Sequence, residues 1–216
     1  MYTPKAFESN ELATLHADIH RSGLATLVSV TGNGLVATHL PLLLDETQGP
    51  YGTLSGHVSL ANSQWRESSG PVEALAIFLG VDAYVSPSWY PAKQETGRVV
   101  PTWNYAAIHA YGCPVFFQDA ERLRALVDRL TDKHEAQFER PWKTTDAPPN
   151  YIDSQLKAIV GFEMQITRLE GKLKFNQNRS AEDRQGVIHA LQKSSGDKDR
   201  QVAVLMERLE ADRPGK

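Results

Sequence analysis

The sequence predicts an α+β protein, mainly β, built on an antiparallel barrel with helices at its ends and between the later strands. Short apolar and β-branched runs, separated by turn residues, fill much of the first half of the 216-residue chain. Helical periodicity is confined to a few segments. Neither G-x-G-x-x-G nor G-x-x-x-x-G-K-[ST] is present, so a parallel βαβ array that cradles a dinucleotide or nucleoside triphosphate is not expected.

The first half predicts one amphipathic helix and then four strands. The helix has apolar residues at i, i+3 and i+7 between a cap and a stop: Leu12, Leu15 and Ile19, with Ser9 or Asn10 as the cap and Gly23 as the stop. Gly32-Asn33-Gly34 predicts a hairpin turn. The expected strands cover residues 24–30, 35–44, 51–58 and 72–81, with breaks at 45–50 and 68–71. Together they favour a four-stranded meander.

The second half predicts strands around an ordered loop over residues 82–112, and then helices. Asp119 opens the clearest helix, through Leu130, and residues 141–150 are expected to form a loop. A strand over 159–169 is expected to turn at Gly171 into 172–175. An S-x-x-D cap at Ser180 starts a helix through Leu191, and a last helix includes residues 202–209. We therefore expect a barrel domain with helical decoration over 1–195 and a helical extension over 196–216.

Composition limits the function classes. A formal net charge of -3 and a pI near 6.2 give no reason to expect a general nucleic-acid or anionic-membrane surface. Cys113 is the single cysteine, so no intramolecular disulfide can form; a reducing cytoplasm is the expected location, and Cys113 is expected to be a small core residue. No membrane span or signal peptide is expected.

Catalytic and metal-binding patterns are weak. His16 and His20 share one helix face at i, i+4, but no third ligand is near in sequence, so two solvent-facing histidines are favoured over a metal site. His39, His57 and His109 lie in strand-like runs, where hydrogen-bonded, partly buried histidines are expected. No G-x-S-x-G elbow is present, and no catalytic residue can be assigned.

Three polar or aromatic strings lie in or beside apolar strands. The first includes residues 37–42, 55–58 and 61–62, where embedded polar groups need partners and a ligand is one way to supply them. The second, residues 86–91 and 100–105, places aromatics between prolines, which suits a planar ligand or a plug for the barrel end. The third, residues 172–179, is locally basic and is suited to a phosphate, to nucleic acid or to simple solvation.

Five ordered strings stand out along the chain: ATHLPL (37–42), SGHVSLAN (55–62), AYVSPSWY (83–90), VPTWNYAAIHAYG (100–112) and GFEMQITRLEGKLKFNQNRSAEDRQGVIHAL (161–191). Together they resemble the PaiB-like family, FMN-binding split-barrel proteins named as negative transcriptional regulators. The resemblance extends from the start of the chain to about Leu191. It implies a split β-barrel that forms a homodimer and holds FMN near the subunit interface.

The resemblance also suggests the cofactor site. The candidate FMN-binding residues combine amide, hydroxyl, imidazole, amine and flat apolar groups: Thr38, His39, Leu40, Ser55, His57, Asn62, Trp89, Trp103, Lys174, Gln177 and Asn178. By analogy with split-barrel flavoproteins, residues 38–40 would run along the ring and residues 55–62 would approach the phosphate. The latter stretch lacks Arg and Lys, so either the phosphate charge is met elsewhere or FMN binding is weak.

Three functions remain open. A flavin-binding regulator would present the basic residues between Arg168 and Arg184 to DNA or to another regulatory protein, although no helix-turn-helix is evident. An FMN-dependent oxidoreductase acting on a small molecule is the main alternative. A ligand-binding barrel without flavin is the third.

Overall fold

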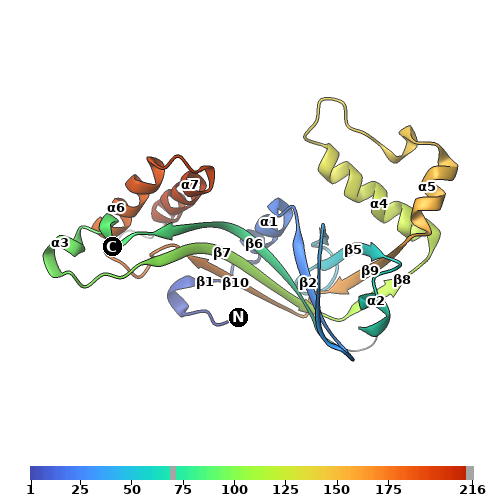
Figure 1. Ribbon diagram of the computed structural model, residues 1–216, viewed down its shortest axis with the longest axis horizontal. Helices are drawn as coiled ribbons and strands as arrows, with labels where there is room; N and C mark the ends of the chain where they lie inside the picture. Colours follow the sequence, from blue (N-terminus) through green and yellow to red (C-terminus); the bar gives the residue numbers. More distant parts are fainter. Residues whose placement is uncertain (69–71, 213–216) are drawn as a thin grey trace. The chain divides into compact units, whose positions relative to one another are not determined.

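The computed structural model describes residues 1–68 and 72–212, so residues 69–71 of the expected break at 68–71 lie outside the described part. Within it the strands form two antiparallel sheets (Figure 1). One has the order β1-β10-β7-β6-β2-β3, and the other has the order β4-β5-β9-β8. The α+β class with antiparallel strands is confirmed. None of the helices in the described part is long and apolar enough to cross a membrane.

The chain divides into two compact units. Of the described residues, unit 1 contains 1–10, 79–108 and 170–212, and unit 2 contains 11–68, 72–78 and 109–169. Three strands contribute residues to both units: β6 (Ala74–Val85), β7 (Thr102–Gly112) and β10 (Arg168–Lys174).

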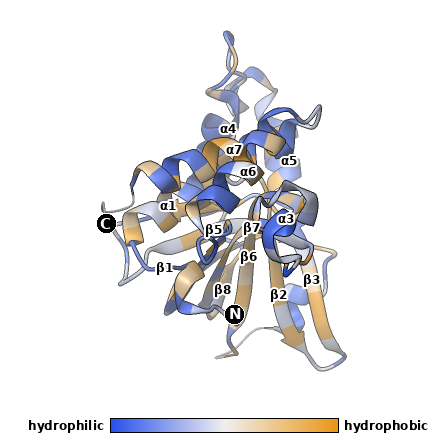
Figure 2. Cartoon of the chain, turned by 90° about the vertical axis from the view of Figure 1, so that its left-hand side faces the viewer, coloured by the Kyte–Doolittle hydropathy of each residue, from blue (hydrophilic) through white to orange (hydrophobic). Residues whose placement is uncertain are grey.

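Unit 2 holds most of the strands. Its other elements are α1 (Leu12–Arg21), β2 (Ala25–Thr31), β3 (Gly34–Leu40), β4 (Leu43–Asp45), β5 (Thr53–Ser59), α2 (Gln64–Glu67), β8 (Pro114–Phe117), α4 (Ala120–Glu135), a short 3-10 turn (Thr144–Asp146), α5 (Pro149–Leu156) and β9 (Ile159–Gln165). Hydrophobic colour is concentrated on the strands, whereas α4 and α5 are mostly hydrophilic (Figure 2).

The core of unit 2 follows the two-residue period of its strands. Leu54 lies opposite Met164 and Val58 opposite Val160, and all four side chains are buried. Gly56 lies between them, where a Cβ would come within 2.6 Å of the Leu42 side chain. A larger residue would therefore not fit at this position.

Helix α4 covers the face of the four-stranded sheet opposite to that of Leu54 and Val58. Leu126 and Leu130 cluster with Leu43, which lies opposite Ser55 in register and so shares its face. The Asp119 side chain accepts a hydrogen bond from the backbone N–H of Arg122 at 2.8 Å and caps α4, as the sequence predicts. The predicted β2–β3 hairpin at Gly32-Asn33 is also confirmed.

Unit 1 is a sheet covered by two helices. Its further elements are a 3-10 turn (Lys5–Phe7), β1 (Glu8–Ser9), a second 3-10 turn (Pro87–Trp89), α3 (Ala92–Thr96), α6 (Ala181–Gln192) and α7 (Asp197–Ala211). Helices α6 and α7 lie side by side (Figure 1). Their apolar residues, among them Leu191 and Met206, form one core with Val85 and Phe175. Ser180 caps α6 by accepting from the N–H of Asp183 at 3.2 Å, as predicted.

Several boundaries differ from the sequence-based expectations. The cap of α1 is Glu11, without a side-chain hydrogen bond, because Ser9 belongs to β1 and pairs with Gly171. Gly171 is therefore inside β10 rather than at a turn, and the turn between β9 and β10 lies at 166–167. The expected loop at 141–150 contains a 3-10 turn and the start of α5. Local pattern did not resolve these cases because long-range pairing and packing define them.

The expected four-stranded meander is also wrong. The run 35–44 breaks at Pro41, whose missing N–H cannot continue a ladder, so β3 and β4 lie in different sheets. β6 pairs with β2 rather than with β5. Three expectations about burial fail as well: Cys113 is exposed, His39 is exposed rather than partly buried, and His16 is buried rather than facing solvent.

Candidate functional site

A hydrogen-bond network joins β2, β3 and α2 in unit 2. The Thr38 hydroxyl donates to the Gln64 side-chain oxygen and accepts from Asn62 Nδ2 at 2.9 Å. Gln64, only 1% exposed, donates from Nε2 to the Leu27 carbonyl oxygen at 3.2 Å and to Ser29 Oγ at 3.0 Å. We call these five residues the Thr38–Gln64 network. It brings together two predicted site residues, Thr38 and Asn62.

The network fixes which polar atoms face outward. Asn62 Oδ1 accepts from the backbone N–H of Gln64 at 3.0 Å, so the amide has a defined orientation. Asn62 Nδ2 has a second N–H beyond the one given to Thr38. The half-buried Asn62 side chain therefore offers an oriented donor at this edge.

The neighbouring predicted residues fall on different sides of their strands. His39 is exposed, and its Nδ1 lies 2.9 Å from Thr26 Oγ1, whereas Leu40 is buried. Ser55 is buried on β5, opposite Leu43 and Glu163. Because strand side chains alternate, Thr38 and Leu40 share a face that excludes His39.

His57 is the predicted site residue with an unsatisfied buried atom. Its Nδ1 has no hydrogen-bond partner within the described part of the chain, and its neighbour in register is Gly161, which has no side chain to offer. Burial lowers the pKa of His57, which favours the neutral ring. An unpaired buried nitrogen costs free energy, so this atom is suited to a ligand or a bound water.

Arg66, a cation that the sequence analysis did not single out, lies next to the stretch 55–62. Arg66, exposed on α2, donates to the Leu60 carbonyl oxygen at 3.3 Å and lies over the Trp65 ring at 4.6 Å. It forms no ion pair with any residue that the structure describes. The stretch 55–62 lacks a basic residue, but the short helix α2 that follows it places the Arg66 side chain against Leu60, near the end of this stretch. Gln64 was missed too, although its position two residues after Asn62 was a usable signal.

Two predicted aromatic residues lie in unit 1. Trp89 is partly buried and packs against the core that α6 and α7 form. Trp103 is 53% exposed, and its ring meets that of Tyr84 edge to face, with 5.9 Å between centroids.

The predicted site residues of the basic string 172–179 make different contacts. Lys174 Nζ donates to Thr102 Oγ1 at 2.6 Å and to the Trp103 carbonyl oxygen at 2.8 Å, so the structure brings Lys174 and Trp103 together. Burial lowers the pKa of Lys174. Gln177 bonds the backbone of its own loop, at Phe175 and Leu173, and Asn178 is exposed.

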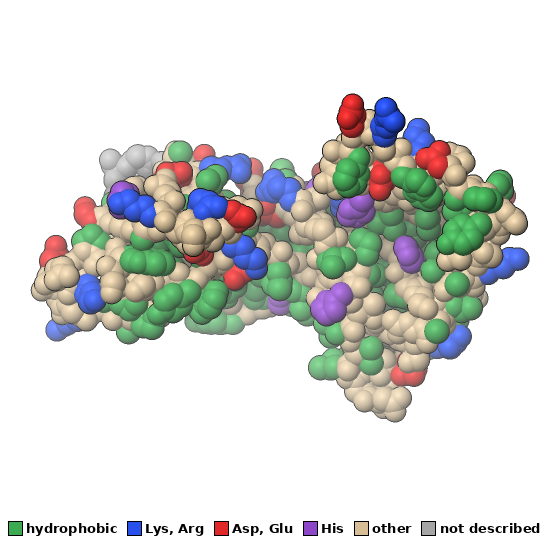
Figure 3. Space-filling view, turned by 45° about the horizontal axis from the view of Figure 1, so that its top comes forward, with side chains coloured by type: hydrophobic (Ala, Val, Ile, Leu, Met, Phe, Trp, Pro, Cys, Tyr) green, Lys and Arg blue, Asp and Glu red, His purple; other side chains and the backbone are tan. Residues whose placement is uncertain are grey.

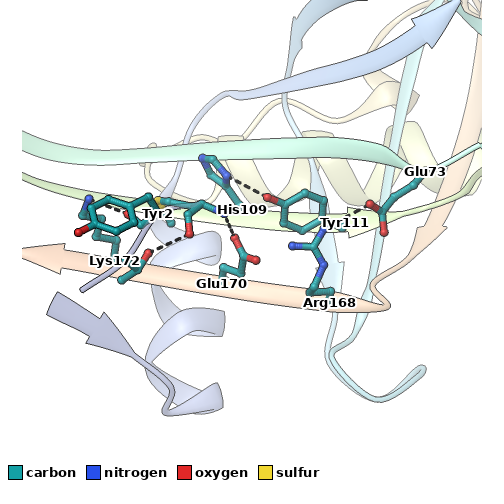
Figure 4. Close-up of polar contacts among 9 residues, drawn as sticks. Tyr2, Glu73, His109, Tyr111, Arg168, Glu170 and Lys172 are labelled. Carbon is teal, nitrogen blue, oxygen red and sulfur yellow. Dashed lines mark hydrogen bonds and ion pairs between the residues drawn. The ribbon is translucent and has the colours of Figure 1, made fainter. Parts of the chain in front are cut away.

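The basic stretch forms internal ion pairs. Arg168 lies over the Tyr111 ring at 3.4 Å and pairs with Glu73 at 3.3 Å, while the Tyr111 hydroxyl lies 3.4 Å from His109 Nδ1 (Figure 4). Arg184 is similarly paired with Glu210 at 2.6 Å. On the face shown in Figure 3, basic and acidic side chains are interspersed. These pairs reduce the positive charge available to an external polyanion.

The two histidines of α1 share one carboxylate. His16 Nδ1 lies 3.2 Å and His20 Nε2 2.7 Å from the oxygens of Glu46, and these hydrogen bonds lower the pKa of Glu46. His16 Nε2 is also 3.0 Å from the Tyr51 carbonyl oxygen. Among residues 1–68 and 72–212, no group of three or more His, Cys, Asp or Glu side chains is arranged to hold a metal ion.

Comparisons with known proteins agree with this architecture. Residues 1–168 match the family model described as "Putative FMN-binding domain". The chain is 32% identical to the protease synthase and sporulation protein PAI 2 of Bacillus subtilis, over 96% of this chain and 97% of that protein. It is also 34% identical to an uncharacterised protein of Aspergillus fumigatus, over 74% of this chain and 77% of that protein.

Two solved structures share the fold at low identity. The FAD- and haem-binding protein of Mycobacterium smegmatis has a TM-score of 0.56 at 16% identity, over 82% of this chain and 78% of that chain. The flavocytochrome Anf3 of Azotobacter vinelandii has a TM-score of 0.55 at 14% identity, over 82% and 74%. With the family match and the Bacillus relative, these findings identify the chain as a member of the PaiB-like family of FMN-binding split-barrel proteins.

Proposed function

We propose that this protein binds FMN, and that unit 2 holds the flavin at the Thr38–Gln64 network, His57 and Arg66. The observation that supports this most directly is the buried Nδ1 of His57, which has no hydrogen-bond partner among the described residues and lies on a strand within the match to the FMN-binding family. The family match covers residues 1–168 and so includes all of these residues.

The donor set fits the parts of FMN. The pyrimidine edge of the ring and the ribityl chain need amide and hydroxyl groups, which Asn62 and Thr38 supply. The phosphate needs a cation, and the guanidinium of Arg66, which has no carboxylate partner among the described residues, meets that need. The absence of a dinucleotide cradle in the sequence favours FMN over FAD.

Bound FMN supplies hydride or electron transfer, whereas this chain binds and orients it. The neutral ring of His57 can donate or accept one hydrogen bond without bringing a charge into its buried position. The Thr38–Gln64 network holds Asn62 in one orientation, so this side chain loses little conformational entropy when a ligand binds.

For the biological role we propose regulation, in keeping with the family resemblance, through DNA or another regulatory protein. The pairing of Arg168 with Glu73 and of Arg184 with Glu210 favours a protein partner over direct DNA contact. A homodimer in a reducing cytoplasm is part of this proposal, supported by the single cysteine and by the family resemblance. Sedimentation should show about twice 24.0 kDa.

The test is a fluorescence titration with FMN, riboflavin and FAD. We expect FMN to bind more tightly than FAD, and Arg66→Ala to weaken FMN by about tenfold while changing riboflavin little, because riboflavin lacks the phosphate. Arg21→Ala is the matched control, since Arg21 is exposed and pairs with Asp18. Failure of the wild type to bind either FMN or riboflavin would refute flavin binding.

A second assay distinguishes a flavin-binding regulator from an FMN-dependent oxidoreductase. A regulator should change its binding to DNA or to a protein partner with flavin state, and DNA binding should weaken with salt. An oxidoreductase should instead turn over a reduced nicotinamide or another small donor in the presence of FMN. Steady turnover without any macromolecular binding would contradict the regulatory proposal.

A further inference from the structure

A buried histidine joins helix α1 to the connection between β4 and β5, residues 46–52, within unit 2. His16 is 4% exposed. Its Nδ1 lies 3.2 Å from Oε2 of Glu46, and its Nε2 lies 3.0 Å from the backbone carbonyl oxygen of Tyr51. Both ring nitrogens therefore meet oxygens of the same connection. We call His16, Glu46 and the Tyr51 carbonyl the α1 latch.

Both partners of His16 are acceptors. A backbone carbonyl oxygen cannot donate, and Glu46 stays ionised because hydrogen bonds from His20 and from His16 lower its pKa. A neutral imidazole has a single N–H, so it satisfies one of these oxygens and turns a lone pair toward the other. An imidazolium has two N–H groups and satisfies both. The geometry therefore selects the protonated ring of His16.

Burial makes the proton of His16 matter to the contact. At 4% exposure, water has little access to replace a partner that the ring loses, and an unpaired buried acceptor costs free energy. His20 is under no such constraint. Its side chain is 43% exposed, and its Nε2 lies 2.7 Å from Oε1 of Glu46, a bond that a neutral ring can donate. Loss of the proton from His16, unlike loss from His20, therefore breaks a contact between α1 and the connection.

The remaining charged groups on α1, on β4 and on the connection are held by other partners: Asp18 by Arg21, and Asp45 by Thr47 and Gln48. Arg129 of α4 acts on Asp45, whose pKa it helps these bonds to lower. Tyr51 takes part through its backbone, which does not titrate. Glu46 is therefore the carboxylate that meets His16.

We propose that the α1 latch is a pH-sensitive switch, which holds α1 on the β4–β5 connection while His16 is protonated and releases it when His16 loses that proton. A free imidazole is half protonated at about pH 6.5, and a partner that binds only the protonated form extends that form to higher pH. The attachment is therefore complete below this pH, as long as Glu46 is ionised, and it weakens as the pH rises above it. The switch uses no residue of the proposed flavin site.

Hydrogen exchange at the backbone amide of Ile19, a buried residue of α1, tests the proposal on the full chain. After correction for the intrinsic rate, we expect opening to be about tenfold more frequent at about pH 8.5 than at about pH 6, because a charge-assisted hydrogen bond is lost. His16→Gln should open equally at both pH values. Glu46→Gln should do the same, because an amide at this position can donate to a neutral ring. Glu46 is exposed, so this variant keeps the test valid if His16→Gln does not fold.

The matched control is His20→Gln, which removes an exposed histidine of the same helix that bonds the same carboxylate. It should keep the pH dependence of the wild type. Every variant retains His57, so the protonation of that residue cancels in the comparison. Nitrogen NMR of the imidazole rings gives a second readout, in which both nitrogens of His16 should carry protons at about pH 6.

Four results overturn the proposal. The wild type opens equally at both pH values, Glu46→Gln keeps the pH dependence, His20→Gln abolishes it, or the His16 ring carries a single proton at about pH 6.

Discussion

Replacing Gln64 by leucine tests whether the Thr38–Gln64 network stabilises unit 2. Gln64 is 1% exposed, and its side chain makes three hydrogen bonds, to Thr38, the Leu27 carbonyl and Ser29. Leucine has a similar volume, so the main loss is polar. Each lost neutral bond costs about 1 kcal/mol, and leaving buried Ser29 unpaired adds a similar amount. The expected loss in the free energy of unfolding is therefore about 4 kcal/mol.

Urea denaturation of the flavin-free protein measures this loss, and the midpoint should fall without a change in slope. Gln48→Leu is the control, because Gln48 is exposed and, among the described residues, its side chain bonds Asp45 alone, at 2.9 Å. A smaller change, within about 0.5 kcal/mol, is expected there. If Gln64→Leu proved as mild as the control, the network would not be a stabilising element.

Three further predictions concern other positions. Gly112→Ala should destabilise the protein by about 2 kcal/mol, because a methyl group would collide with the carbonyl oxygen of Gln165; thermal melting checks this, and an unchanged melting temperature would contradict it. Burial lowers the pKa of His57, so the unfolded state binds its proton more readily, and stability should fall as the pH drops below the ordinary value of 6.5. His57→Gln should flatten this dependence in urea titrations at several pH values, and an unaltered slope would refute the assignment. Asn176, at φ 63° with its amide bonded to the Tyr90 hydroxyl at 2.6 Å, should tolerate glycine better than alanine, because glycine adopts this backbone freely; equal melting temperatures of the two variants would exclude that reason.

Elements defined by local signals were predictable from sequence. Asp119 and Ser180 cap their helices because a short side chain can reach the free N–H groups of the first turn, whatever the rest of the fold does. The Gly32-Asn33 turn likewise fixed the β2–β3 hairpin. The candidate site was foreseen to the extent that embedded polar residues such as Thr38 and His57 need partners.

The sequence alone also determined the antiparallel α+β class and, through its ordered strings, the family. Only the tertiary structure decided that Gly171 lies inside a strand, that His16 is buried, and that Arg66 lies beside the stretch that lacks a cation. Periodicity reports which face of an element is apolar, but not which distant strand or carboxylate will meet that face. Those partners are chosen by the packing of the whole core and by the pairing of buried polar groups, and neither can be evaluated within a short window of sequence.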